Sequence, residues 1–148
     1  MDRSRASRAT LGFFAAAIAV LIIEQGLASL LHQWRLSGLE MPGTYDMTPQ
    51  GPFNTPAVLV KCFKYGLLGL VFGLMAPVLP RPFWMPGVVL GATYGFVVLL
   101  IVPQYEILNP LDFGAPLPGH WAPQFVLNTV WGLGLGVCYS LMSGMQDF

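Results

Sequence analysis

The stretch LGFFAAAIAVLIIEQGLASLL, residues 11–31, carries a single charged residue, Glu24, within a run of mostly apolar and small side chains. A helix needs about 20 residues of this kind to cross the apolar core of a bilayer. Three later windows have a similar length and composition, and proline, which ends helices, is concentrated in the connections between the windows. The sequence therefore predicts an all-α membrane protein with four transmembrane helices, over residues 10–33, 57–77, 83–102 and 123–145.

The composition agrees with a single integral membrane domain over residues 1–148. Of the 148 residues, 55% are hydrophobic and 9% are charged, whereas soluble domains carry about 25% charged residues. A soluble protein of this size could not bury so much apolar surface, so membrane lipid is expected to cover part of it. The net charge is zero, which gives no indication of nucleic acid as a partner.

The distribution of charge predicts how the helices are oriented. Three arginines precede the first helix, and Arg81 lies in the short connection between the second and the third. The two long connections, residues 34–56 and 103–122, carry mainly acidic residues. By the positive-inside rule, both termini are expected in the cytoplasm, and the protein in the inner membrane of a bacterium. The long connections are rich in proline and are expected to fold back over the outer ends of the helices, where proline keeps the entropic cost of ordering low.

The two halves of the chain resemble each other when they are shifted by 67 residues. Pro56 then aligns with Pro123, because 123 − 56 is 67. In the same shift, Gly69 aligns with Gly136. The pattern predicts two tandem helix hairpins that form a parallel 2+2 repeat with proline-rich outer loops. Chance matching between two apolar segments is the alternative.

Small residues recur at every fourth position on three of the predicted helices. Residues spaced in this way lie on one helix face and allow helix backbones to approach closely in lipid. Packing within the four-helix bundle is one interpretation, and a face that binds another chain or a second copy is the other. The residues expected to pack helices are Gly69, Gly73, Gly87, Gly91, Gly95, Gly132, Gly136 and Ser140.

Glu24 is the most informative polar residue, because a carboxylate inside a membrane is costly unless it is paired, protonated or hydrated. Lys64 lies at a similar expected depth on the second helix, so we expect a Glu24–Lys64 pair. Lys61 lies one turn farther out on the same face, and Gln25 and Asn128 complete the set of intramembrane polar candidates. This set predicts a structural pair that fixes helix register, a relay for protons or cations, or a contact of Glu24 with a partner subunit or with water at the outer surface.

His32 and His120 are the only histidines, and both are expected near the outer membrane surface. The sequence predicts no cofactor and no metal site, because no ligand spacing resembles a zinc site. A haem or another pigment held by the two histidines stays an open alternative.

The chain contains no Ser/His/Asp array, phosphate-binding loop or dinucleotide fingerprint, so an enzyme is not favoured. The first hypothesis is a small non-catalytic membrane subunit or scaffold that packs within a larger membrane protein complex. The alternative is a small oligomeric transporter or channel, coupled to ions or protons, that uses the Glu24–Lys64 pair.

Overall fold

A computed structural model of the chain describes residues 4–34, 45–101 and 121–144, and this part is mostly helical. The first helix is continuous from Arg5 to Trp34 and has three parts. These parts are α1 (Arg5–Ile18), the π-helical turn η1 (Ala19–Glu24) and α2 (Gln25–Trp34). Three further helices follow, namely α3 (Ala57–Met75), α4 (Trp84–Ile101) and α5 (Trp121–Ser143). The described residues thus contain four helices close to the four that the sequence predicts.

The ends of the helices follow from local sequence. The side chain of Ser4 accepts a hydrogen bond of 3.2 Å from the Ser7 N–H, and such a cap starts the first helix at Arg5 instead of near residue 10. Helix α3 begins directly after Pro56 and ends two residues before Pro77. Pro86 lies in the first turn of α4. Proline is tolerated there, because N–H groups of the first turn have no acceptor within the helix.

A short antiparallel β-hairpin precedes α3 and lies within the long connection after the first helix. It pairs β1 (Pro49–Gln50) with β2 (Thr55–Pro56). Gly51 and Asn54 close the turn with positive φ angles of 66° and 50°, a conformation that glycine and asparagine adopt at low cost. The second long connection, residues 103–122, lies almost wholly outside the described residues.

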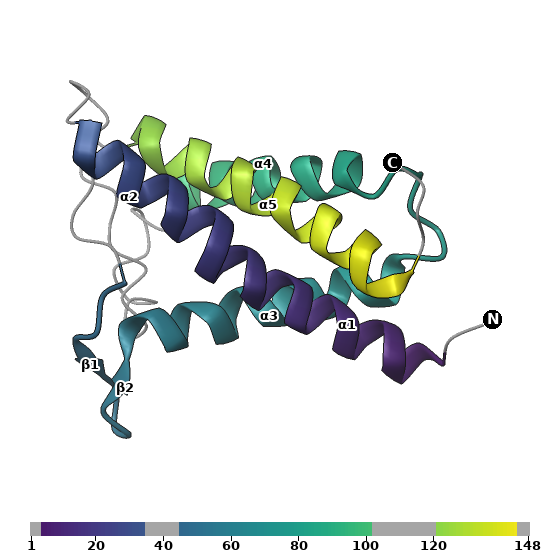
Figure 1. Cartoon of the computed structure of the whole chain (residues 1–148), viewed down its shortest axis with the longest axis horizontal. Helices are drawn as coiled ribbons and strands as arrows, with labels where there is room; N and C mark the ends of the chain where they lie inside the picture. Colours follow the sequence, from purple (N-terminus) through teal and green to yellow (C-terminus); the bar gives the residue numbers. More distant parts are fainter. Residues whose placement is uncertain (1–3, 35–44, 102–120, 145–148) are drawn as a thin grey trace.

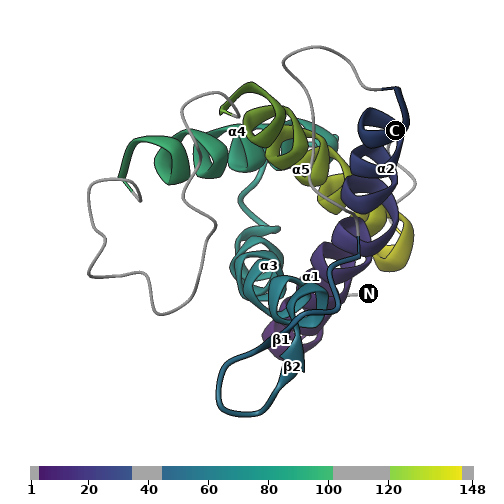
Figure 2. The same cartoon turned by 90° about the vertical axis from the view of Figure 1, so that its left-hand side faces the viewer.

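The helices form two antiparallel pairs, α1 with α3 and α4 with α5 (Figures 1 and 2). The first helix also packs on α5 through α1 and η1, and this contact joins the two pairs. The start of α1, the end of α5 and the turn between α3 and α4 lie at one end of the molecule, called here the terminal end (Figure 1). The β-hairpin and the end of α2 lie at the opposite end, called here the hairpin end.

Glycines allow the helices of each pair to touch backbone to backbone. A Cβ atom added at Gly69 would collide with the backbone of Gly12, and one added at Gly73 would collide with the backbone of Arg8. The same holds between α4 and α5, where Gly87 and Gly132 exclude any side chain at each other's position. The remaining predicted packing residues also lie inside the chain. Gly91 lies against Asn128 and Gly132, Gly95 lies against the side chain of Asn128, Gly136 lies against Phe83 and Trp84, and the Ser140 hydroxyl donates to the Gly136 carbonyl at 2.9 Å.

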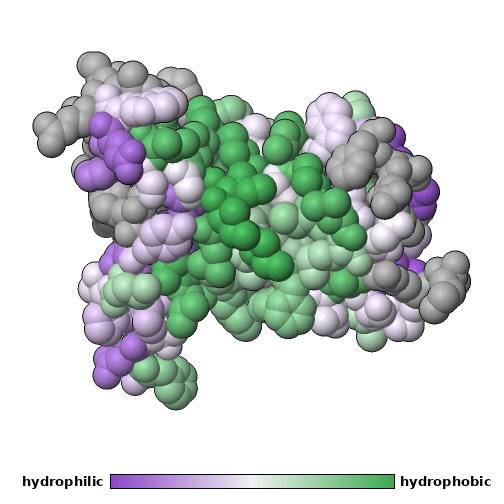
Figure 3. Space-filling model, in the orientation of Figure 1, coloured by the Kyte–Doolittle hydropathy of each residue, from purple (hydrophilic) through white to green (hydrophobic). Residues whose placement is uncertain are grey.

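The surface of the molecule has an apolar band between two more hydrophilic ends (Figure 3). Three helices, Arg5–Trp34, Ala57–Met75 and Phe125–Ser143, are long and apolar enough to cross a membrane, and α4 contributes a shorter apolar helix over Trp84–Val98. Large apolar side chains point outward from all four helices, for example Ile22, Phe63, Val89 and Leu141, which are 67%, 58%, 64% and 61% exposed. Length and composition are therefore those of a membrane-spanning bundle.

Candidate functional site

Glu24 is buried inside the bundle at the end of the π-helical turn. Its side chain is only 1% exposed, although it carries a carboxylate and is surrounded by apolar helices. Burying a charge is costly unless the charge is paired and hydrogen-bonded, so the groups around Glu24 determine what this position can do.

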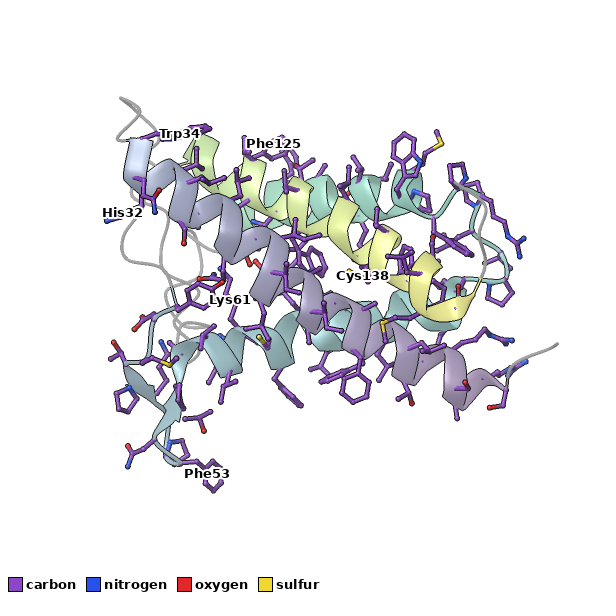
Figure 4. All side chains as sticks on the ribbon, viewed as in Figure 1. His32, Trp34, Phe53, Lys61, Phe125 and Cys138 are labelled. Carbon is purple, nitrogen blue, oxygen red and sulfur yellow. The ribbon has the colours of Figure 1, made fainter. Side chains whose placement is uncertain are left out.

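Lys61 of α3 forms the ion pair with Glu24, with Nζ 2.5 Å from Oε1. The Lys61 side chain remains 30% exposed, and it reaches from α3 toward the first helix near the hairpin end (Figure 4). The sequence placed Lys64 in this pair, so the observed pair differs from the expected one by one helical turn. Lys64 lies on α3 on the side of Lys61 toward the terminal end and is half-buried.

The glycine contacts explain why Lys61 faces Glu24. Ala16 lies against Gly69 where α1 crosses α3. Gly69 also lies against the backbone of Gly12, and the helices are antiparallel, so counting toward the hairpin end from these two contacts brings residue 24 level with residues 57–61. The register set by close backbone contact therefore brings Lys61, and not Lys64, opposite Glu24.

The second carboxylate oxygen of Glu24, Oε2, is buried and accepts no hydrogen bond from the described residues. Buried polar atoms without a partner are rare in folded proteins, and each requires an explanation. Glu24 is thus held by one oxygen only, with its other oxygen enclosed.

The π-helical turn changes the backbone hydrogen bonds next to Glu24. In an α-helix the Gln25 N–H would donate to the Leu21 carbonyl, four residues back. Here the Gln25 N–H donates to the carbonyls of Val20 and Ile22 instead. The Leu21 carbonyl accepts a hydrogen bond of 2.9 Å from the Tyr45 hydroxyl, and the Gln25 side chain accepts one of 2.8 Å from the Tyr45 N–H. The segment before the β-hairpin therefore folds back onto the first helix at Tyr45, as the sequence predicts for the outer loops.

An aromatic cluster lies on the terminal side of the Glu24–Lys61 pair. Tyr65 of α3 donates its hydroxyl to Asn128 Oδ1 of α5 at 2.6 Å. The Tyr65 ring packs edge-on against Trp131 and Tyr94, with centroid distances of 4.6 Å and 5.4 Å. The Lys61 ammonium lies 5.7 Å from the centroid of the same ring. Asn128, a predicted polar candidate, is thereby connected to the pair through Tyr65.

A second aromatic cluster lies farther toward the terminal end. Phe72, Phe83 and Tyr139 pack edge-on against one another at centroid distances between 5.3 Å and 6.3 Å. All three side chains are buried. The polar groups around Glu24 therefore lie on the hairpin side of two consecutive aromatic clusters.

Two of these residues have roles that the sequence analysis did not assign. Tyr45 is far from Leu21 and Gln25 along the chain, so the sequence gives no local signal of these contacts. Trp131 donates its indole N–H to the Ala16 carbonyl at 3.1 Å, and this bond joins α5 to α1 just before the π-helical turn. A tryptophan deep in an apolar helix was the only signal available for this bond, since a buried indole N–H needs an acceptor.

Of the two histidines that the sequence suggests as ligands, only His32 lies within the described residues. His32 is exposed on α2 at the hairpin end (Figure 4), and His120 lies outside the described residues. Within residues 4–34, 45–101 and 121–144, His, Cys, Asp and Glu side chains do not gather into a group that could hold a metal ion.

Comparisons of the chain with protein-family models, with curated proteins and with solved structures found no match.

Proposed function

We propose that this chain is a small non-catalytic integral membrane protein that packs as a subunit or scaffold within a larger membrane complex. Its membrane location is supported by the apolar band, the long apolar helices and the large apolar side chains on its outer surface (Figure 3). Arg5, Arg8 and Arg81 all lie toward the terminal end, and this end is the cytoplasmic one by the positive-inside rule. The hairpin end then faces outward, across the inner membrane of a bacterium.

The observation that carries the proposal is that buried aromatic clusters pack between the polar site and the terminal end. A transporter must expose its binding site to the two sides of the membrane in turn, commonly by rocking helices around a site near the bilayer midplane. In the described part of the chain, the clusters around Trp131 and Tyr139 fill the bundle between Glu24 and the terminal end. This arrangement favours a bundle with a fixed interior over one that passes ions through its core.

A partner would have to bind the outward apolar side chains, because the glycines that the sequence offered as a possible binding face lie against helices of the same chain. The candidate residues on the outer surface are large and apolar, as at Phe63 and Val89. Lipid covers whatever part of this surface a partner leaves open.

We also propose that the two helix pairs form a tandem repeat. In the first pair, Gly69 lies against the backbone of Gly12, and in the second pair, Gly136 lies against the backbone of Phe83. Gly69 and Gly136 are the positions that align when the chain is shifted by 67 residues. Equivalent positions thus make the same kind of contact in both pairs.

One observation supports the alternative, a small oligomeric transporter or channel. Oε2 of Glu24 is enclosed without a hydrogen bond from the described residues, and an ion or a proton would satisfy it. In this alternative the working pair is Glu24–Lys61, in place of the Glu24–Lys64 pair inferred from sequence, with Asn128 nearby.

Flux and assembly separate the two functions. The subunit proposal expects Glu24→Gln to leave proton or cation flux in reconstituted liposomes unchanged, because no flux depends on the chain. It also expects that enlarging an outward residue, for example Val89→Trp, releases the chain from its complex. Loss of a measurable flux in Glu24→Gln, with assembly unaffected, would establish the transporter instead.

A further inference from the structure

Tyr45 has an unusual backbone conformation for its residue type. Its φ angle is 53°, in the left-handed region that bulky side chains rarely adopt. Such a conformation persists only where the surrounding contacts outweigh its cost. The two contacts from Tyr45 to Gln25 and Leu21 supply these restraints, and both are made to the π-helical turn or to the residue directly after it.

The same two contacts stabilise the π-helical turn. A π-helical turn holds one more residue per hydrogen-bonded ring than an α-helical turn and is less stable on its own. The α-helical alternative would return the Gln25 N–H to the Leu21 carbonyl, and the Tyr45 hydroxyl now occupies that carbonyl. The Tyr45 N–H donates a hydrogen bond to the side chain of Gln25, the residue whose own N–H would make the α-helical bond.

We propose that Tyr45 is a latch that keeps residues 19–24 in the π-helical state, and that its release lets this segment return to an α-helix. The change from π to α would turn α2 relative to α1 by about 100°, the rotation of one residue in an α-helix. Glu24 lies at the boundary of the turn, so the rotation would withdraw its carboxylate from Lys61. The latch goes beyond the proposed subunit role, because it gives the bundle a second state at its outer end.

The position of the latch makes it accessible from outside the molecule. Tyr45 is 42% exposed at the hairpin end, whereas Glu24 is only 1% exposed. A hydrogen-bonding group of a partner could therefore compete for the Tyr45 hydroxyl without entering the bundle. The cluster of Phe72, Phe83 and Tyr139 and the contacts of Gly69 and Gly73 with α1 lie on the terminal side of the turn and would stay in place.

The test uses single cysteines in the full-length chain, after Cys62→Ser and Cys138→Ser remove the native thiols. Ala28 of α2 is 4% exposed and packs in a small buried cluster with Leu31 and Leu127, so Ala28→Cys reports whether α2 has turned. Its rate of labelling by a small maleimide is compared with and without Tyr45→Phe, which removes only the hydroxyl. Phe53→Ala is the matched control, because Phe53 lies in the same connection and is 88% exposed.

We expect Tyr45→Phe to raise the labelling rate of Ala28→Cys by about tenfold, which corresponds to about 1.4 kcal/mol and to the loss of about one hydrogen bond. Deletion of Ile22 removes the extra residue of the π-helical turn, so α2 keeps its orientation although the segment becomes α-helical. In this background, Tyr45→Phe should no longer raise the labelling rate. Phe53→Ala should leave it unchanged.

Two results would overturn the latch. One is a labelling rate in Tyr45→Phe within about twofold of the parent, a change too small for a lost hydrogen bond. The other is a parallel rise in the labelling of Leu135→Cys, because Leu135 is fully buried in α5 and its exposure would mean general unfolding instead of a local turn.

Discussion

At the residue scale, the Glu24–Lys61 pair is expected to stabilise the fold only as a pair. Lys61→Met leaves the buried carboxylate without its cation, and removing one member of a buried pair costs about 3 kcal/mol or more. The low end of that range applies here, because the Lys61 side chain is 30% exposed. The double variant Glu24→Gln/Lys61→Met removes both charges and should be more stable than Lys61→Met alone, as measured by thermal unfolding in detergent.

Lys64→Met is the matched control for this prediction. It removes a lysine of the same helix that is not the observed partner of Oε1, so its effect should be smaller than that of Lys61→Met. A larger effect at Lys64 would restore the pair inferred from the sequence and contradict the register described above.

The hydrogen bond between Tyr65 and Asn128 is expected to join the two helix pairs. Tyr65→Phe removes the donor and leaves a buried amide oxygen short of one partner, which should destabilise the bundle by about 1–2 kcal/mol. A double-mutant cycle with Asn128→Leu should give a coupling energy of about 1 kcal/mol, as contacting residues do. Additive effects of the two substitutions would show that the bond contributes nothing.

The residues of the site differ in how far the sequence could predict them. Glu24 was predictable, because a lone carboxylate within the apolar stretch of residues 11–31 requires a partner wherever it lies. The identity of the lysine was not predictable, because the depth estimate placed Lys64 level with Glu24. The crossing point at Ala16 and Gly69 decides the pair, and such a crossing depends on the tertiary structure.

At the element scale, the close approach of α4 and α5 depends on Gly132. Gly132→Ala would drive a methyl group into the backbone at Gly87, and the helices must separate to accommodate it, at a cost of about 1–3 kcal/mol. In contrast, Gly26→Ala adds a methyl group where no atom lies within 4 Å, and alanine is the better helix former by about 0.5–1 kcal/mol. Thermal unfolding should therefore rank Gly26→Ala above the parent and Gly132→Ala below it. Equal stability of the two variants would contradict the packing.

The elements themselves were largely predictable, and their irregularities were not. Long apolar windows bounded by prolines predict the helices, since Pro56 and Pro77 flank α3 on its two sides. The π-helical turn has no such signal in its own sequence, AVLIIE. The Leu21 carbonyl of the turn accepts its hydrogen bond from Tyr45, a residue that is distant along the chain, so local sequence gives no sign of the turn.

At the scale of the whole molecule, the topology is expected to place the turn between α3 and α4 opposite the β-hairpin. Val78 and Phe53 are 79% and 88% exposed at these two ends. A membrane-impermeant thiol reagent applied to intact cells from which the outer membrane has been removed should label Phe53→Cys and spare Val78→Cys. The reverse pattern would show that the orientation derived from Arg5, Arg8 and Arg81 is wrong.

The whole fold also limits what the chain can do. The sequence is compatible with both a scaffold and a transporter, because an intramembrane carboxylate such as Glu24 could serve either function. The position of the aromatic clusters on one side of Glu24 is a property of the assembled bundle and favours the scaffold. It follows in part from Tyr65, Tyr94 and Trp131 meeting across three helices, which no spacing within one helix reveals.

The most direct test of the subunit role is the native mass of the chain after purification from its own membrane in a mild detergent. We expect a mass well above 16.1 kDa, with the same partner proteins in a fixed ratio, and loss of those partners in Val89→Trp. A chain that runs alone or as a small homo-oligomer, and whose liposomes show a flux that Glu24→Gln abolishes, would contradict it.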